Sequence, residues 1–177
     1  MKFLKILLAI VVVLILLFFV VGAFLPKTYS VNRSTTINAP DSVIYGNIAN
    51  FNEFNKWNPW IKMEPSAKTT ITGEVGKPGH LFEWAGDKTG SGQMKILSAT
   101  PYSNVNIELK FIKPFESLAN CKFDIVKEND GYKVTWTMSG ENPNTMSKWM
   151  SLMMDYMIGK DFDNGLASLK EKSEKGE

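Results

Sequence analysis

The chain has 177 residues, 20 basic and 18 acidic, with one cysteine, Cys121, and one histidine, His80. A single cysteine excludes an internal disulfide, and this Cys/His content excludes a metal site built from those residues, which needs three or four ligands. The sequence has no glycine-rich phosphate loop, GxSxG or HExxH motif, so the enzyme classes that these motifs mark are not indicated. A metal site built from Asp and Glu alone stays open as an alternative, although no calcium-loop spacing appears. We expect no metal and no cofactor.

The first predicted element is a transmembrane helix within residues 1–25. Residues 6–25 read ILLAIVVVLILLFFVVGAFL and carry no charge. Twenty residues at about 1.5 Å each match a hydrocarbon core about 30 Å thick. We expect a single-pass anchor that contacts the membrane through residues 4–25. A cleaved signal peptide is the alternative, with Val21-Gly22-Ala23 as its cleavage site, although its apolar core would exceed the usual length of about 7–15 residues.

Charge determines the orientation of this anchor only weakly. Lys2 and Lys5 precede the apolar run, and Lys27 and Arg33 follow it. A short basic N-terminal tail usually stays inside, so we expect the remaining domain on the exported side. Without Lys2 and Lys5 that domain has 18 basic and 18 acidic residues. A neutral domain with no basic run predicts no nucleic-acid partner.

After a linker over residues 26–30, residues 31–177 are expected to form one domain. Residues 31–37 alternate as a strand, and Pro40 then marks a helix start. A second short helix is expected over Phe51–Trp57, because the residue before Pro59 is pushed out of the helical region.

A series of short strands follows. The stretch 104–111 shows the clearest alternation, with Val105, Ile107, Leu109 and Phe111 on one face. Asn129-Asp130-Gly131 predicts a hairpin turn. We expect strands over residues 69–73, 79–84, 91–100, 104–111, 115–126 and 132–140.

The C-terminal part is predicted to be one long helix beginning near Asn142-Pro143. Its apolar stripe has a period of about 3.6 residues and consists of Met146, Trp149, Met150, Met153, Met157, Phe162, Leu166 and Leu169. Gly159 and Gly165 weaken its middle and favour a bend there. The whole order predicts an α+β fold, in which the helix lies over a curved antiparallel sheet and leaves a ligand cavity between the layers.

Four segments in this order resemble the SRPBCC family. They are VNRSTTINAP at 31–40, FNKWNPW at 54–60, VTWTMSG at 134–140 and DFDNGLASLK at 161–170. This polyketide cyclase/dehydrase-like family belongs to the helix-grip superfamily, together with START lipid-transfer domains and plant allergens. The resemblance implies about seven antiparallel strands wrapped round a long C-terminal helix, with a cavity for a hydrophobic ligand. It implies no catalytic residue, because no catalytic motif matches.

The residues expected to line this cavity are large and apolar. They are Trp60, Phe82, Ile107, Leu109, Phe111, Phe123, Trp136, Met138, Trp149, Met153 and Met157. Flexible methionines on the long helix suit an adaptable cavity wall, but ordinary packing of the helix on the sheet is the favoured explanation. Trp57 and Trp60 either guard the cavity mouth or cap the core.

The leading functional hypothesis is a membrane-tethered, non-enzymatic domain that binds a hydrophobic or lipid-like small molecule. The alternative is a cyclase- or dehydratase-like enzyme acting in the same cavity, with His80 or Tyr132 as its best candidates. A third possibility is an accessory domain with a solid interior and no ligand. Cys121 is expected in the core, and Asp155, Asp161 and Asp163 on a solvated helix face.

Overall fold

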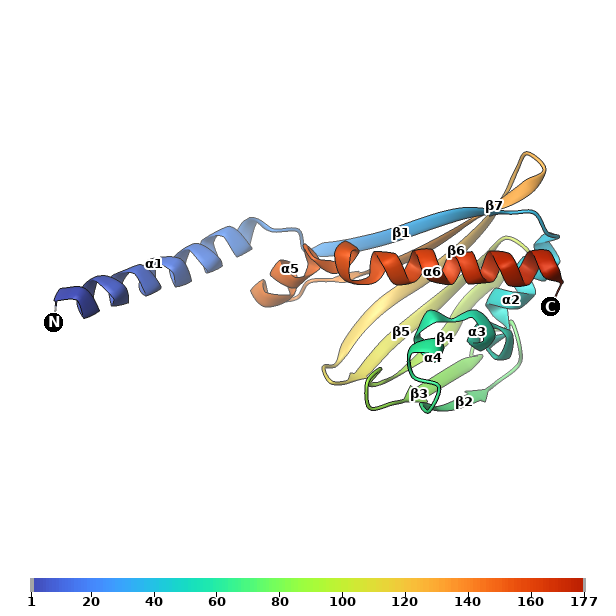
Figure 1. The fold of residues 1–177 in the computed structure, drawn as a ribbon, viewed down its shortest axis with the longest axis horizontal. Helices are drawn as coiled ribbons and strands as arrows, with labels where there is room; N and C mark the ends of the chain where they lie inside the picture. The colour runs from blue at the N-terminus through green and yellow to red at the C-terminus, as the bar shows by residue number, and fades with distance from the viewer. Residues whose placement is uncertain (1, 177) are drawn as a thin grey trace.

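The computed structural model describes residues 2–176, in which a seven-stranded antiparallel sheet curves around a long C-terminal helix (Figure 1). The order in the sheet is β1-β7-β6-β5-β4-β3-β2, so every strand from β2 to β7 pairs with its neighbour in sequence, and β1 pairs with β7. The strands are β1 (Thr28–Ile37), β2 (Lys68–Thr72), β3 (Leu81–Ala85), β4 (Ser91–Thr100), β5 (Asn104–Lys113), β6 (Ser117–Glu128) and β7 (Gly131–Glu141). The expected helix-grip fold is confirmed.

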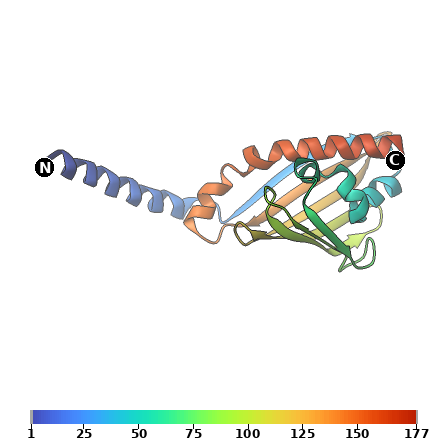
Figure 2. The same ribbon diagram turned by 60° about the horizontal axis from the view of Figure 1, so that its bottom comes forward.

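Six helices accompany the sheet. They are α1 (Lys2–Phe24), α2 (Asp41–Ala49), α3 (Phe51–Trp57), α4 (Pro59–Met63), α5 (Thr145–Ser151) and α6 (Met154–Lys175). Helices α2–α4 connect β1 to β2 and pack beside α6, which lies across the concave face of the sheet (Figure 2). Side-chain caps separate the short helices, because Asn50 accepts from the Asn52 N–H and Asn58 from the Trp60 N–H.

Alternation along the strands determines which side chains face α6. On β5, Val105, Ile107 and Leu109 are buried, while the residues between them are more exposed. A register shift between Ile96 and Ser98 interrupts the β4–β5 pairing, and irregularities of this kind bend a strand. The sheet therefore presents one continuous apolar concave face.

The C-terminal helix is not continuous, which corrects the expectation of one helix from residue 142. Helix α5 ends at Ser151, and α6 begins at Met154. The break does not fall at the glycines. Gly159 lies against the Arg33 guanidinium and Gly165 against the Trp136 ring, so a side chain would collide at either position. These glycines allow α6 to approach the sheet closely.

Two further differences bear on how the elements are connected. Strand β1 begins at Thr28 and not at Val31, because its pairing with β7 continues to Glu141. Helix α4 was not expected at all, although Pro59 at its first turn and the Asn58 cap favour a helix start. The first of these differences shortens the connection between α1 and the sheet.

Helix α1 projects from one end of the domain (Figure 1). Within residues 2–176 it is the one helix long and apolar enough to cross a membrane. Nearly all of its side chains are exposed, because the sheet does not cover them. Only its C-terminal end packs, against α5.

Candidate functional site

A cavity of about 370 Å³ lies between the N-terminal half of α6, helix α4 and the concave face of the sheet. Its volume is within the range of about 300–1,000 Å³ that is usual for small-molecule sites. The helices contribute Trp60, Ile61, Met63, Ile158 and Phe162. The strands contribute Phe82, Trp84, Met94, Leu109, Phe111, Trp136 and Met138. These walls are apolar, so the cavity suits an apolar guest.

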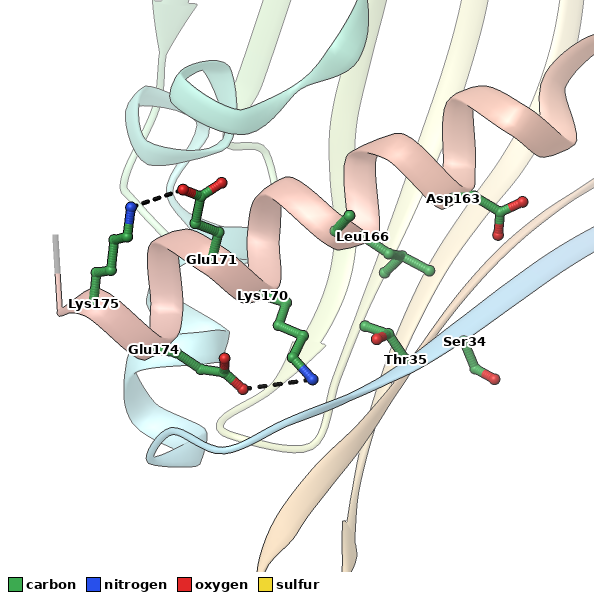
Figure 3. Close-up of a pocket in the computed structure, with 9 residues that line it drawn as sticks. Ser34, Thr35, Asp163, Leu166, Lys170, Glu171, Glu174 and Lys175 are labelled. Atoms are coloured by element: carbon green, nitrogen blue, oxygen red, sulfur yellow. Dashed lines mark hydrogen bonds and ion pairs between the residues drawn. The ribbon is translucent and has the colours of Figure 1, made fainter.

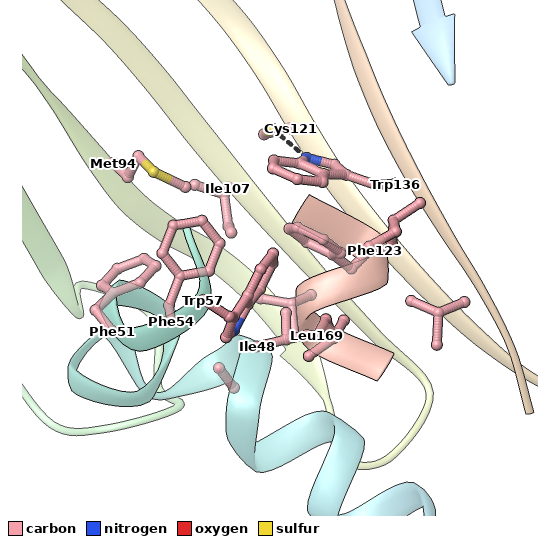
Figure 4. Close-up of a cluster of buried hydrophobic side chains, with 14 of the residues drawn as sticks. Ile48, Phe51, Phe54, Trp57, Met94, Ile107, Cys121, Phe123, Trp136 and Leu169 are labelled. Carbon is pink, nitrogen blue, oxygen red and sulfur yellow. Dashed lines mark hydrogen bonds between the residues drawn. The ribbon is translucent and has the colours of Figure 1, made fainter. Parts of the chain in front are cut away.

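A stack of aromatic rings closes the inner end of this cavity. The Trp136 ring lies between Phe123, at 4.9 Å between centroids, and Phe162, at 4.1 Å. Trp60 meets Trp136 edge-on at 5.8 Å. Beyond the stack, Phe54 and Trp57 fill the space under the C-terminal half of α6 (Figure 4). The cavity therefore occupies only one half of the space between helix and sheet.

Cys121 lies on the cavity wall but is held as an inert thiol. It is 2% exposed, and its Sγ accepts a hydrogen bond from Trp136 Nε1 at 3.1 Å. Burial raises the pKa of this thiol to about 11, because the thiolate would be poorly solvated. At neutral pH the group is therefore protonated and a weak nucleophile.

Polar groups lie at the mouth of the cavity. Lys88, on the β3–β4 loop, and Asp161, on α6, both line it. Met63 is 53% exposed, so the mouth opens to the surface between α4, this loop and α6. An amphipathic guest could place its polar end here and its apolar part inside.

The β3–β4 loop at the mouth is held by Glu64, which directly follows α4. The Glu64 carboxylate accepts from the backbone N–H groups of Asp87, Lys88 and Thr89 and from the Thr89 hydroxyl. These bonds, led by those from Thr89, lower the pKa of Glu64 to about 2, because they favour its charged form. Glu64 thus fixes one wall of the mouth.

A second hollow, of about 460 Å³, is an open groove between β1 and the C-terminal half of α6 (Figure 3). Ion pairs occupy it: Lys170 pairs with Glu174 at 3.7 Å and donates to the Thr36 carbonyl at 2.8 Å, and Lys175 pairs with Glu171. A charged groove open to water suits an apolar ligand less well than the apolar cavity beneath α6.

Six of the eleven residues expected at the site do line the cavity. They are Trp60, Phe82, Leu109, Phe111, Trp136 and Met138. The other five lie elsewhere. Ile107 and Phe123 belong to the filled half of the core, Trp149 packs on α1, and Met153 and Met157 are more than half exposed.

The helix break explains the positions of Trp149 and Met153, whereas Met157 lies on α6 but on its exposed side. Because α5 and α6 are separate, Trp149 and Met153 do not continue the stripe of Phe162 over the sheet. The lining residues that sequence reasoning missed include Ile61 and Met63, which lie on the unexpected α4. Trp84 shares a strand face with Phe82 and could have been included on that ground.

His80 and Tyr132 do not lie at the cavity. His80 Nε2 accepts from the Phe51 N–H at 3.2 Å, and Nδ1 lies 3.0 Å from the Thr72 carbonyl, to which it donates in this tautomer. Both ring nitrogens thus join α3 to β2. Tyr132 lies beneath the Lys127 ammonium, 4.6 Å from its ring centroid, near the β6–β7 turn.

Asp155 and Asp163 lie on a solvated face of α6, as expected, with side chains 65% and 60% exposed, and both also contact Arg33. Asp155 binds the Arg33 guanidinium through both carboxylate oxygens, at 2.8 and 3.0 Å, and Asp163 lies 3.4 Å from Arg33 Nε. The hydrogen bonds from Arg33 lower the pKa of Asp155. Together these contacts fix α6 against β1, while Asp161 lies at the cavity mouth.

No group of three His, Cys, Asp or Glu side chains in residues 2–176 is placed to hold a metal ion. The single histidine and the single cysteine are both engaged in hydrogen bonds within the core.

Solved structures share this fold at low sequence identity. A protein from Thermobifida fusca superposes with a TM-score of 0.63 at 16% identity, covering 82% of this chain and 93% of that one. Ara h 8.0201 gives 0.54 at 12%, covering 80% and 97%. The di-domain ARO/CYC StfQ from the steffimycin biosynthetic pathway gives 0.62 at 7%, covering 85% of this chain and 52% of its own. At these identities the likeness concerns the fold alone.

No curated protein matches the sequence. Residues 28–174, which include the whole sheet and nearly all of α6, match the family described as polyketide cyclase/dehydrase and lipid transport. The chain therefore belongs to the polyketide cyclase/dehydrase and lipid transport family.

Proposed function

We propose that this protein is a membrane-tethered binding protein for a hydrophobic or amphipathic small molecule of lipid-like character. The observation that carries the proposal is the apolar cavity of about 370 Å³ beneath α6. Its affinity would come from removing apolar ligand surface from water, at about 25 cal/mol per Å² before the costs of association. The volume favours one small molecule or a single acyl chain.

The chemistry of the walls supports binding more than catalysis. The cavity wall offers aromatic and aliphatic side chains, a protonated thiol and the neutral polar Asn58 and Thr89. Its ionisable groups, Lys88 and Asp161, lie at the mouth. General acid–base catalysis needs a titratable group within hydrogen-bond reach of the reacting atoms. The cyclase-like alternative would therefore have to use groups at the rim.

We also propose that α1 is an uncleaved anchor and that the domain lies on the exported side. Residues 6–25 are long enough to span, and the basic Lys2 and Lys5 favour an inside N-terminus. Intact mass spectrometry of the chain recovered from membranes tests this. The full mass supports the anchor, whereas loss of the residues up to about Ala23 would identify a cleaved signal peptide.

Ligand binding is tested by titrating the full chain, in detergent micelles, with a fluorescent fatty acid. A Leu109→Trp variant fills the cavity from β5, and Leu97→Trp makes the same change at an exposed position. We expect saturable binding that Leu109→Trp weakens at least tenfold, a loss of about 1.4 kcal/mol. Equal affinity in the two variants would refute binding in this cavity.

A further inference from the structure

The end of the domain nearest α1 carries a cluster of exposed apolar side chains on α5 and the first turn of α6. We call this cluster the interfacial surface. Each member is more than half exposed: Met146, Met150, Leu152, Met153, Tyr156 and Met157. Soluble proteins rarely expose contiguous apolar patches without a partner. The position of this patch relative to α1 indicates which partner covers it.

Specific contacts fix α5 against the C-terminal turns of α1. The Trp149 ring stacks on Phe18 at 5.5 Å, and its Nε1 donates to the Phe18 carbonyl at 3.2 Å. Lys148 Nζ donates to the Gly22 carbonyl at 3.2 Å and lies 3.4 Å from that of Ala23, so it caps the end of α1. These contacts set the depth of α5 relative to α1.

Helix α5 therefore packs beside α1 at the level of Phe18, and not at Leu25, where the apolar run ends. Phe18 precedes Leu25 by seven residues, which is about 10 Å along a helix. If α1 spans the bilayer, a helix packed at Phe18 cannot remain entirely in water. Interfacial amphipathic helices bury their apolar faces by about 5–10 Å, which agrees with this depth. Lys148 can extend its charged end toward the headgroups while its stem stays apolar.

We propose that the interfacial surface lies in the headgroup–acyl boundary of the bilayer that α1 spans. This inference rests on the proposed anchoring of α1. In this arrangement the apolar side chains of α5 contact lipid. These contacts hold the domain at the membrane with a fixed tilt, whereas α1 alone would be a free tether.

The same surface leads to the cavity mouth. The Met153 N–H donates to the Met150 carbonyl and the Met157 N–H to the Met153 carbonyl, so these residues follow one another by single turns. Asp161, at the mouth, is four residues beyond Met157 and lies on the same helix face. Flexible methionines thus connect the bilayer to the cavity, and an apolar guest could enter without crossing water.

Fluorescence quenching in vesicles tests the lipid contact. The full chain, with a fluorophore on Met153→Cys or on Met150→Cys, is reconstituted in phosphatidylcholine vesicles with brominated acyl chains. The control label is at Val126→Cys, equally exposed but near the β6–β7 hairpin at the opposite end (Figure 1). Cys121 can remain, because it is buried. We expect at least twofold quenching at residues 150 and 153 and none at 126.

Flotation of the same vesicles separates failure of the inference from failure of the anchor. If the protein floats with the vesicles but the three labels respond alike, the interfacial surface does not touch lipid and the inference is wrong. Label self-quenching that grows with protein density, without an effect of bromine, would assign the surface to a second copy of this chain and also overturn it. A chain that does not float refutes both the anchor and the inference.

Discussion

The space between α6 and the sheet is filled at one end and hollow at the other, although alternating apolar strands form the floor of both. Beneath the C-terminal half of α6, Phe54 and Trp57 of α3 pack against Phe123 and complete a solid core. Beneath the N-terminal half, the short α4 covers the strands only at the side, and the cavity remains. The short helices between β1 and β2 therefore decide where the space beneath α6 stays open.

The largest expected effect is a difference in the free energy of unfolding between two variants. Each variant removes one phenylalanine ring, from the filled end or from the hollow end of the space beneath α6. Phe123→Ala removes a fully buried ring from the filled end and should lower the free energy of unfolding by about 3–5 kcal/mol. Phe111→Ala, at the half-buried edge of the cavity, should cost less than half as much, because the space beside it is already empty. Urea denaturation of the full chain in detergent measures both. Equal costs would show that the two ends do not differ in packing.

Two glycines in helices test how closely α6 packs on the sheet at the boundary between the filled and the hollow end. Gly165 lies at this boundary, and Gly46 is the control. A Cβ at Gly165 would lie 2.8 Å from the Trp136 ring and 3.3 Å from Pro59 Cδ, so Gly165→Ala should destabilise by about 1–3 kcal/mol. Gly46→Ala, within α2, meets no atom within 4 Å and should stabilise by up to about 1 kcal/mol. The same denaturation curves test both changes. A stabilising Gly165→Ala would mean that α6 is not held close to the Trp136 ring.

The smallest expected effect is the pH dependence of stability that Glu64 contributes at the mouth of the cavity. The pKa of Glu64 is about 2 in the folded protein, against 4.5 for the unperturbed group. The unfolded state therefore binds more protons between these values, so the stabilisation by Glu64 is complete above pH 4.5 and declines as the pH falls toward 2. Over this window the urea midpoint should fall less in Glu64→Gln than in the parent protein. Identical slopes would show that Glu64 does not hold the β3–β4 loop.

The sequence was sufficient to predict the strands and the fold. The alternation of residues 104–111 corresponds to β5, and the Asn129-Asp130-Gly131 turn connects β6 to β7. The helix over Phe51–Trp57 has the predicted bounds. These features are local, because hydrophobic period and turn chemistry act over a few residues.

The site was less predictable, because it depends on contacts between distant elements. Phe123 and Phe111 have the same alternating pattern, and the packing of Phe54 and Trp57 against Phe123 distinguishes the core residue from the one that lines a cavity. The break at Leu152–Met153 carries no glycine or proline signal. It coincides with the docking of Trp149 on α1, a contact 131 residues apart in sequence.

The most direct measurement is native mass spectrometry of the full chain, released from detergent after exposure to a membrane lipid extract. We expect one apolar or amphipathic molecule bound per chain, retained by Leu97→Trp and lost from Leu109→Trp. No adduct on the parent protein, or the same adduct on both variants, would contradict the claim that the cavity beneath α6 holds a ligand.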